Sequence, residues 1–440
     1  MKVMKFGGTS VGKPERMHSI ARLVIKQQEP VIVVLSALSG TTNALVAIGD
    51  KIAANDREGA KELIGQLELH YQNFIKELVQ KEELYKKAKA VIAEHFEFLQ
   101  IILRISFSEA LQKDILAQGE LLSTKLFCIY LEEQGIAHQF LPALDFMSID
   151  NNDEPALGSI SEKLGALLAK HNGISLFVTQ GYICKNSRGE VDNLKRGGSD
   201  YSASLIAAAI KASACEIWTD IDGMHNNDPR VVKKTVPIEQ LSFEEAAELA
   251  YFGAKILHPA SIWPAQQYKI PVKLLNTMEP EAKGTLISEN AGAIGVKAVA
   301  AKDSIIAIRI KSSRMLLAYG FLRKIFEVFE KYRTPIDMIT TSEVAVSLTI
   351  DNATHLAEIL NELEPFGAIE VDKDQAIISV VGNKIGQTED VIKRVFDSIS
   401  GIPVRMVSYG GSPHNISILI DAEKKQAILQ QLNKGIFGLD

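Results

Sequence analysis

The sequence predicts an α/β protein in two parts: a mostly parallel sheet sandwiched by helices over residues 1–295, and a region of two βαββαβ modules over 296–440. Three observations support this division. Short apolar runs alternate with helical patterns in the first part, a long proline-free stretch rich in helix formers interrupts that alternation, and the pattern of the second part occurs twice. A length of 440 residues also suggests two or three domains rather than one.

Composition and charge narrow the class of protein. Hydrophobic residues make up 46% of the chain and charged residues 23%, which is typical of a globular protein with a large core. The net charge of −6 and the pI near 5.9 argue against a nucleic-acid partner or a membrane-surface protein. No apolar run approaches the ~18 residues that span a bilayer. Glycines interrupt the first apolar stretch, so we expect no signal peptide and a cytoplasmic protein.

The cysteines support the same compartment. Cys128, Cys184 and Cys215 lie far apart in the sequence, with no CxxC pair and no histidine at zinc-ligand spacing. We therefore expect reduced, mostly buried thiols, no metal site and no reactive role for Cys184.

The first strands and helices follow from apolar periodicity. Val3–Phe6 is expected to be a strand, Glu15–Gln28 a helix and Val31–Leu35 a buried strand, because continuous Val/Ile runs suit a parallel sheet covered on both faces. Between Pro30 and Pro142 there is no proline, and apolar residues recur at helical spacing. We therefore expect a helical insertion over about 50–115.

The alternation then resumes up to a domain boundary. We expect strands and helices in turn at Ile174–Thr179, Ser202–Ala212, Glu216–Thr219, Phe243–Tyr251 and Val272–Leu275. Glycines at 284, 292 and 295 are expected to loosen the chain between about 280 and 300, where we place the boundary.

The C-terminal region has a repeated pattern. Expected strands and helices follow one another at Ile305–Ile310, Phe321–Tyr332, Val344–Ile350, His355–Glu364, Ala376–Val381, Thr388–Ile399, Val404–Ser408, Asn415–Ile420 and a last helix from about Glu423. Ile336–Thr340 and Val404–Ser408 hold equivalent places in the two halves. We expect two ferredoxin-like modules, about 305–380 and 381–440, in tandem or interleaved.

One N-terminal motif predicts a site for polyphosphate. In the run Lys5-Phe6-Gly7-Gly8-Thr9-Ser10, glycines without a Cβ let backbone N–H groups approach an anion, and Lys5 adds a mobile positive charge. Pro14 suits the first turn of the helix that follows. The run from Gly7 to Lys13 also approaches a P-loop, but Pro14 stands where that motif requires Ser or Thr, so we reject it. A simple tight turn remains the alternative.

A second glycine pair precedes another predicted helix. In Lys195-Arg196-Gly197-Gly198-Ser199-Asp200, we expect Ser199 or Asp200 to cap the helix and Arg196 to offer its planar guanidinium to a carboxylate. Taken alone, the segment could be a helix cap beside a solvated arginine. Two such turns, each next to a basic residue, suggest one site where two anions meet.

Further polar residues follow predicted strands or turns. Thr219-Asp220-Ile221-Asp222-Gly223 places carboxylates at the end of a strand, where ligands bind in open α/β sheets, and it lacks the other ligands of an EF-hand. Arg230 follows a turn at Asp228-Pro229, and Lys255 precedes an expected helix break at Pro259. Glu120 could hold an ammonium group or simply start a helix. Solvated side chains are the alternative for Arg230 and Lys255.

Together these motifs resemble those of aspartokinases, in the monofunctional form with a C-terminal pair of ACT modules. The resemblance covers essentially the whole chain. It is carried by the two glycine-pair motifs, by Thr219–Gly223, by Phe252-Gly253-Ala254-Lys255 and by Ile339-Thr340-Thr341-Ser342-Glu343, all in the order that the family shows. The fold implied is of the amino-acid-kinase type, with its nucleotide-binding part over about 215–295.

The resemblance implies roles for individual residues. Lys5 would contact the transferring phosphate and Asp200 would orient it, while Thr42, Glu120 and Arg196 would hold L-aspartate. ATP, with Mg²⁺, would be bound by the nucleotide and phosphate residues Gly7, Gly8, Thr9, Ser10, Thr219, Asp220, Arg230 and Lys255. One departure is His225, where the family often has Tyr, and it puts an adenine or ribose contact at this position in doubt.

The implied reaction is phosphoryl transfer from ATP to the β-carboxylate of L-aspartate, giving 4-phospho-L-aspartate for lysine, threonine and methionine biosynthesis. The ACT modules imply a homodimer or higher oligomer and an allosteric amino acid, lysine or threonine. The positions that match a lysine site are Met315, Gly320, Phe321, Asp337, Ser342 and Glu343. Leu317 and Ala318 depart from that pattern, replacing more polar residues.

Three other functions compete with this one. Acetylglutamate, glutamate or UMP kinases share the expected fold, but they do not predict the helical insertion or the duplicated tail. A non-catalytic ACT sensor leaves Lys5, Arg196, Asp200 and Lys255 unexplained. Fusion to homoserine dehydrogenase is excluded by the length.

Overall fold

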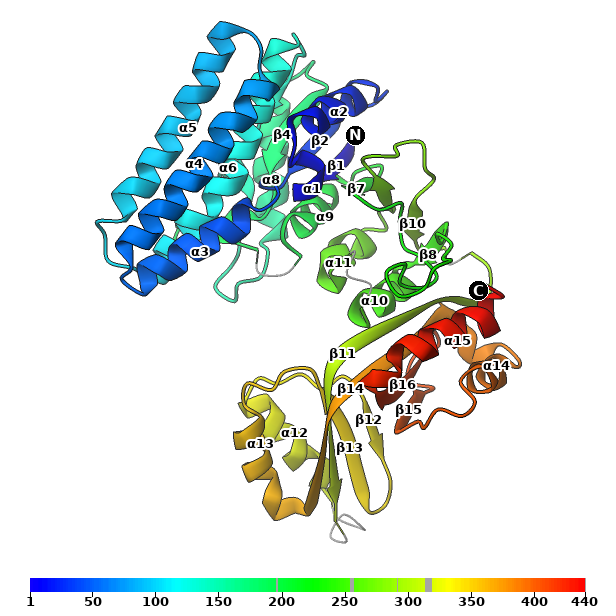
Figure 1. Ribbon diagram of the computed structural model, residues 1–440. Helices are drawn as coiled ribbons and strands as arrows, with labels where there is room; N and C mark the ends of the chain where they lie inside the picture. The colour runs from blue at the N-terminus through cyan, green and yellow to red at the C-terminus, as the bar shows by residue number, and fades with distance from the viewer. Residues whose placement is uncertain (195–196, 254–256, 291, 313–318, 440) are drawn as a thin grey trace. The chain divides into compact units, whose positions relative to one another are not determined.

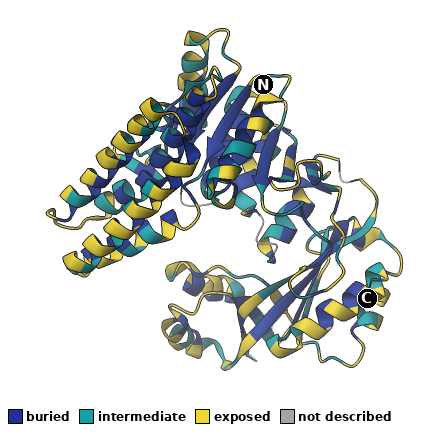
Figure 2. Cartoon of the chain, turned by 45° about the horizontal axis from the view of Figure 1, so that its top comes forward, coloured by how far each residue is buried: buried dark blue, intermediate teal, exposed yellow. Residues whose placement is uncertain are grey.

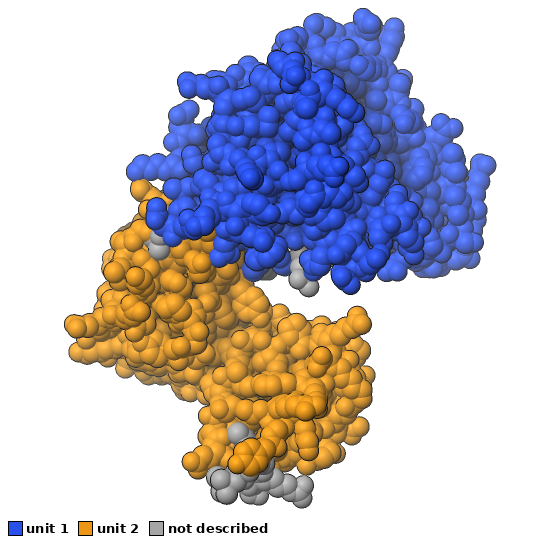
Figure 3. All heavy atoms as spheres, turned by 180° about the vertical axis from the view of Figure 1, so that it is seen from behind, with its two compact units in different colours: residues 1–224, 257–290 blue, residues 225–256, 291–440 orange. Residues whose placement is uncertain are grey.

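The computed structural model describes residues 1–194, 197–253, 257–290, 292–312 and 319–439. The chain divides into two compact units (Figure 3). Unit 1 comprises Met1–Met224 and Leu257–Asn290, and unit 2 comprises His225–Ile256 and Ala291–Asp440. The division does not follow the order of the sequence, because the segment 225–256 belongs with the C-terminal region.

Unit 1 is built on a mostly parallel sheet (Figure 1). Its strands lie in the order β3-β4-β2-β1-β7-β9-β10, and only β10 runs antiparallel to its neighbour in that series. The bounds are β1 Lys2–Phe6, β2 Val31–Leu35, β3 Gln139–Phe140, β4 Leu176–Gln180, β7 Cys215–Thr219, β9 Val272–Asn276 and β10 Thr285–Ser288. β2 and β4 are buried along their whole length, as their apolar composition predicts, and the predicted fold class is confirmed.

Long helices pack beside this sheet. α3 (Thr41–Ala53), α4 (Arg57–Leu78), α5 (Glu82–Ile102) and α6 (Glu109–Glu133) lie against one another in sequence order (Figure 1). α4 and α5 bury one face and expose the other, as Figure 2 shows, whereas α6 also contacts β2 and β4 and is buried over much of its surface. The other helices of unit 1 are α1 Gly8–Val11, α2 Pro14–Ile25, α7 Ala143–Phe146, α8 Leu157–Lys170, α9 Gly198–Ile210 and α11 Pro259–Gln267.

The local structure of unit 1 differs from the prediction at four points. An unpredicted four-residue helix, α1, begins at Gly8 and precedes the predicted helix, which has Pro14 in its first turn as expected. α9 begins at Gly198, so Gly197 is its N-cap and neither Ser199 nor Asp200 caps it. Pro259 opens α11 instead of breaking a helix, because proline is well tolerated in the first helical turn. The glycine-rich stretch near 280–300 contains strand β10.

Unit 2 contains a six-stranded antiparallel sheet in the order β12-β13-β11-β14-β16-β15. The bounds are β11 Gly295–Lys311, β12 Ile339–Thr341, β13 Ala345–Ile350, β14 Ala368–Asn383, β15 Met406–Tyr409 and β16 Asn415–Asp421. β11 and β14 pair over nearly their full length, with register shifts around Lys302 and Ile305. Before these shifts β11 belongs to one hydrophobic cluster, and after them it belongs to another.

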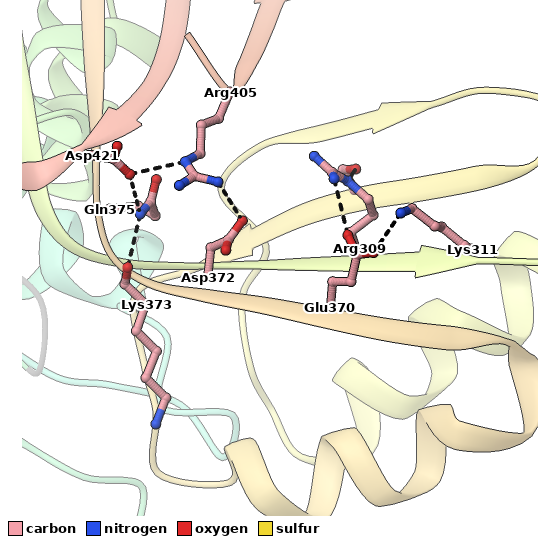
Figure 4. A network of polar contacts seen from close by, with 9 residues as sticks. Arg309, Lys311, Glu370, Asp372, Lys373, Gln375, Arg405 and Asp421 are labelled. Carbon is pink, nitrogen blue, oxygen red and sulfur yellow. Dashed lines mark hydrogen bonds and ion pairs between the residues drawn. The ribbon is translucent and has the colours of Figure 1, made fainter. Parts of the chain in front are cut away.

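Each cluster has its own pair of helices. α12 (Phe321–Lys331) and α13 (Leu356–Leu363) cover the half with β12 and β13, and α14 (Val391–Ser398) and α15 (Lys425–Phe437) cover the half with β15 and β16. A chain of polar contacts lies on the sheet (Figure 4). Arg405 there contacts Asp372 on β14 and Asp421 on β16, both at 3.0 Å, which ties neighbouring strands together.

The remaining elements are two short strands of a hairpin, β5 Ile183–Lys185 and β6 Val191–Asn193, together with β8 Gln240–Ser242 and α10 Phe243–Tyr251. Ser242 and Glu245 form a capping box at the start of α10. No helix within the described part of the chain is long and apolar enough to cross a membrane.

Candidate active site

The carboxyl ends of four parallel strands lie together in unit 1. Phe6 at the end of β1 is in register with Leu35 of β2 and Trp218 of β7, and Leu35 is in register with Gln180 of β4. Each strand leads into a polar or glycine-containing turn. In open α/β sheets ligands bind at this edge, so the turns after these strands define the candidate site.

Lys5 and Asp200 meet at this edge. Lys5 lies near the end of β1, Asp200 lies in the first turn of α9, and the Lys5 Nζ is 2.6 Å from the Asp200 Oδ1. The side chains are 11% and 17% exposed, so the pair is shielded but reachable. The two glycine-pair motifs are thus brought to one place in unit 1, as predicted.

The first glycine pair lies where there is little space for a side chain, and its backbone conformation does not itself call for glycine. Gly7 has a φ of −73°, which any residue can adopt. A Cβ on Gly8 would lie 3.1 Å from the carbonyl oxygen of Ala37, and one on Gly7 would lie 3.3 Å from the Lys5 Nζ. The Gly7 N–H donates to the Trp218 carbonyl at 3.2 Å, so in this structure that amide is used within the sheet edge.

The hydroxyl groups of this motif differ in their surroundings. Ser10 is buried, and its Oγ lies 2.7 Å from the Thr277 Oγ1 and donates to the Trp218 carbonyl at 3.3 Å. Thr9 is exposed. Ser10 therefore links α1 to β7 and to the residue that follows β9.

Glu120 is the most unusual ionisable group near this edge. Its side chain lies on α6 and is buried, and its Oε1 accepts the Ala37 N–H at 3.1 Å. Its Oε2 has no hydrogen-bond partner among the described residues. Burial raises the pKa of Glu120 to about 8, against the lowering effects of the Ala37 hydrogen bond and of the positive charge on Lys5. An unpaired buried carboxylate oxygen is a strong acceptor for a ligand cation.

Gly119 sets how closely α6 approaches the turn after β2. A Cβ there would lie 2.7 Å from the Ala37 Cβ and 3.3 Å from the Thr41 Cγ2. We expect Gly119→Ala to destabilise the fold by about 1–3 kcal/mol through overpacking and to displace Glu120. Gly65→Ala is the matched control, because Gly65 lies in α4 with no atom within 4 Å of its Cβ position, and it should stabilise by about 0.5–1 kcal/mol. Thermal unfolding measures both, and equal stability of the two variants would contradict this packing argument.

The other residues predicted to hold aspartate are placed less fully. Thr42 is exposed in the first turn of α3. Its neighbour Thr41 is buried, with its Oγ1 3.0 Å from the Tyr71 hydroxyl. Arg196 lies outside the described residues. Sequence reasoning missed the contribution of Ala37 and Tyr71, since neither residue type carries a signal of its own.

The predicted nucleotide residues fall in both units. Thr219 ends β7, and its Oγ1 donates to the Asp220 Oδ1 at 3.1 Å. Arg230 belongs to unit 2, where its exposed guanidinium pairs with Asp228 at 2.7 Å. His225 contacts the Thr235 Oγ1 through its Nδ1 at 2.8 Å. Lys255 lies outside the described residues.

The residues predicted to bind an effector lie in unit 2, apart from Met315, which is outside the described residues. Gly320 has a φ of +77° and caps α12, and Phe321 packs on Phe366 in the core. Ser342 and Glu343 are exposed in the turn between β12 and β13. The Asp337 carboxylate is 1% exposed and accepts hydrogen bonds from the Tyr251 hydroxyl and the Lys302 ammonium, each at 2.7 Å.

Neither the cysteines nor a metal cluster offers other chemistry in the parts of the chain described here. Burial raises the pKa of the Cys184 thiol to about 12, which leaves almost no nucleophilic thiolate at neutral pH. No three His, Cys, Asp or Glu side chains among the described residues are grouped to hold a metal ion.

Comparison with known proteins identifies the family. The model of the amino acid kinase family matches residues 1–276, and that of an ACT domain matches residues 378–435. The chain is 33% identical over 455 residues to the lysine-sensitive aspartokinase 3 of Escherichia coli, covering 99% of both chains.

Solved structures give the same result. Aspartokinase III of E. coli in complex with aspartate and ADP (R-state) is 32% identical, with a TM-score of 0.86 over 99% of this chain and 100% of that one. The same enzyme in complex with lysine and aspartate (T-state) gives a TM-score of 0.80 at 32% identity, over 99% of each chain. The chain therefore belongs to the amino acid kinase family, and within it to the aspartokinases that carry a C-terminal ACT domain.

Proposed function

We propose that this aspartate kinase transfers the γ-phosphoryl group of ATP to the β-carboxylate of L-aspartate at the sheet edge that carries Lys5, Asp200 and Glu120. The observation that carries the proposal is the Lys5–Asp200 contact at 2.6 Å, with the buried Glu120 carboxylate on the adjoining helix. A positive charge and a buried carboxyl group with one unpartnered oxygen, both at the same edge, suit a substrate that bears both charges.

The proposed reaction requires no removal of a proton from the attacking group. A β-carboxylate is already ionised near pH 7, so no general base is needed. The obstacle is the approach of one anion to another, so catalysis rests on positioning and on neutralisation of charge. In our proposal Lys5 contacts the transferring phosphoryl group, and Asp200 holds the Lys5 ammonium in place.

Glu120 provides the contact for the substrate ammonium. Its Oε2 lacks a partner among the described residues, and a bound ammonium would supply one while stabilising the ionised carboxylate. Arg196 would take the α-carboxylate, and Thr42 would complete the aspartate site. Both roles rest on the motifs and on the relative solved with aspartate and ADP.

The nucleotide site in this proposal comprises Gly7, Gly8, Thr9, Ser10, Thr219 and Asp220 of unit 1. Nucleotide contacts by Arg230 and Lys255 are proposed from their motifs alone. Mg²⁺ usually binds through substrate phosphates and one or two carboxylates, so Asp200 or Asp220 suffices as the protein contribution, and a three-ligand cluster is not required. When bound, the ion would neutralise phosphate charge.

ADP release tests the proposal directly. We expect release that depends on L-aspartate, with little release when acetylglutamate, glutamate or UMP replaces it. Preference for any of those acceptors would contradict the proposed substrate.

We also propose feedback control by lysine at the residues around Asp337. The relatives named lysine-sensitive and solved with lysine support this proposal, and threonine is the alternative effector. Titrating ADP release with each amino acid is expected to show inhibition by lysine at concentrations where threonine has little effect. A chain insensitive to both would refute the regulatory proposal and leave the catalytic one standing.

Self-association through the C-terminal region completes the proposal. β12 and β15 are the edge strands of the unit 2 sheet, and apolar side chains on or beside them are partly exposed: Ile339 at 37%, Val344 at 53% and Tyr409 at 43%. Such edges readily pair with another copy. We infer a homodimer or a larger oligomer in the cytoplasm, which light scattering of the purified chain would reveal.

A further inference from the structure

The Asp337 carboxylate is contacted by two other segments of unit 2 that are far from it in the sequence. Its Oδ1 accepts the Tyr251 hydroxyl from the end of α10 at 2.7 Å. The same Oδ1 lies 2.7 Å from the Nζ of Lys302 on β11. The Lys302 ammonium also lies 2.9 Å from Asp351 and 4.4 Å from the centre of the Tyr251 ring.

Lys302 is held as a cation in this cluster. Burial would lower its pKa, but hydrogen bonds and charge from Asp337 and Asp351 outweigh burial and raise it. Two carboxylates and one ammonium leave the cluster with one net negative charge. Lys302 also sits where the register of β11 and β14 shifts, which is the junction between the two halves of the sheet.

The second oxygen of Asp337 remains available. Its Oδ2 is buried and has no hydrogen-bond partner among the described residues. Asp337 lines a cavity of about 270 Å³ together with Glu248, Tyr251, Met338 and Asn415. A ligand ammonium that reaches Asp337 would therefore share one small carboxylate with the ammonium of Lys302, and two cations at that distance repel each other.

We propose that Lys302 is a built-in competitor for the effector ammonium at Asp337 and thereby sets the affinity of the chain for its amino acid effector. The inference rests on the proposed regulatory role of Asp337. Replacing Lys302 with an uncharged side chain of similar length leaves two carboxylates to attract the incoming ammonium. The same replacement leaves Asp337 buried without its cation, which destabilises the unliganded fold.

The test compares Lys302→Met with the wild-type chain, using L-lysine as the probe. We expect calorimetry to show lysine binding about tenfold tighter to Lys302→Met, a typical effect of one close charge at a partly shielded site. We also expect a lower melting temperature without lysine, and a larger rise in melting temperature on adding lysine than the wild type shows. The larger rise in melting temperature is specific to the proposal, because it requires the ammonium of the bound lysine to replace the ammonium lost with Lys302.

Two matched variants complete the design. Lys302→Arg keeps the charge and should bind lysine as the wild type does. Lys311→Met removes an exposed lysine of the same strand, paired with Glu370 at 2.5 Å, and should change neither affinity nor the response to lysine. If Lys302→Met folds poorly alone, purification in lysine should restore it, and failure of lysine to do so would count against the proposal.

The outcomes separate the two proposals. A wild-type chain inhibited by lysine, with unchanged or weaker binding in Lys302→Met, would overturn the role of Lys302 and leave lysine regulation intact. A wild-type chain that ignores lysine while Lys302→Met binds it would support Lys302 as the competitor and refute lysine regulation of the natural chain. If neither protein binds lysine, both proposals fall.

Discussion

Lys5→Met is expected to reduce kcat by about 10²–10³-fold, the range found when one group that stabilises transition-state charge is removed. Lys5 lies at the carboxyl end of β1 with its ammonium 2.6 Å from Asp200, so its loss removes a positive charge next to the proposed transfer point. Methionine retains most of the buried aliphatic volume. Circular dichroism should show an intact fold, and the ADP assay should show the loss mainly in kcat.

Lys2→Met provides the matched control for this experiment. Lys2 lies on the same strand and also pairs with a buried carboxylate, Glu216, at 3.0 Å, but it sits at the opposite end of β1. We expect this variant to lose some stability and keep its turnover. If a folded Lys5→Met variant turned over as fast as Lys2→Met, the assignment of Lys5 would be wrong.

Glu120→Gln is expected to raise the KM for L-aspartate by one to two orders of magnitude, because a hydrogen bond to a charged group contributes about 1.5–3 kcal/mol. Kinetic titration with aspartate at fixed ATP measures this change. Glu133→Gln is the control, since Glu133 is a second buried glutamate of α6 whose carboxylate accepts backbone N–H groups of Gln80 and Lys81, each at 2.6 Å. An equal rise in KM for both variants would argue against a substrate contact at Glu120.

The pH dependence follows from the same group. The pKa of Glu120 is about 8 in the unliganded fold, so the ionised form that binds an ammonium becomes scarcer as the pH falls below that value. We expect the KM for aspartate to fall as the pH rises toward 8 and then to level off. The amide introduced by Glu120→Gln cannot titrate, so the KM of that variant should be flat over this range.

The stability of the fold should decrease as the pH rises, whereas the binding of aspartate should strengthen. The pKa of Glu120 in the folded chain lies above its ordinary value of 4.5, so folding takes up a proton between the two values, and stability falls as the pH rises from about 4.5 to about 8. Glu120→Gln lacks this loss. Its free energy of unfolding, compared with that of the wild type, should therefore increase from acidic pH to pH 8.

Some parts of this fold could be predicted from local sequence and others could not. The apolar run Val31–Leu35 and the amphipathic helix Phe243–Tyr251 match the structure residue for residue. Burial on both faces leaves an unbroken apolar run, and burial on one face of a helix leaves a helical periodicity. The start of α9 could not be predicted, because the left-handed conformation of Gly197 allows the helix to begin at Gly198, ahead of the apolar pattern that starts near Ser202. The length of β11 depends on pairing with β14, a contact between distant segments.

The same distinction applies to the site. The proximity of Lys5 to Asp200 could be predicted because the two motifs that carry them have a characteristic composition and order. The elevated pKa of Glu120 could not, since it depends on α6 packing against the turn after β2 at Gly119. The contact of Lys302 with Asp337 could not be predicted either, because nothing in the sequence marks two residues 35 positions apart as partners.

A crystal structure with L-aspartate and a non-hydrolysable ATP analogue tests the central claim most directly, since it locates both substrates relative to Lys5 and Glu120. We predict that the Lys5 Nζ lies within hydrogen-bond distance of an oxygen of the terminal phosphate, and that the aspartate ammonium contacts the Glu120 Oε2. Aspartate or the terminal phosphate bound away from the ends of β1 and β2 would contradict this account.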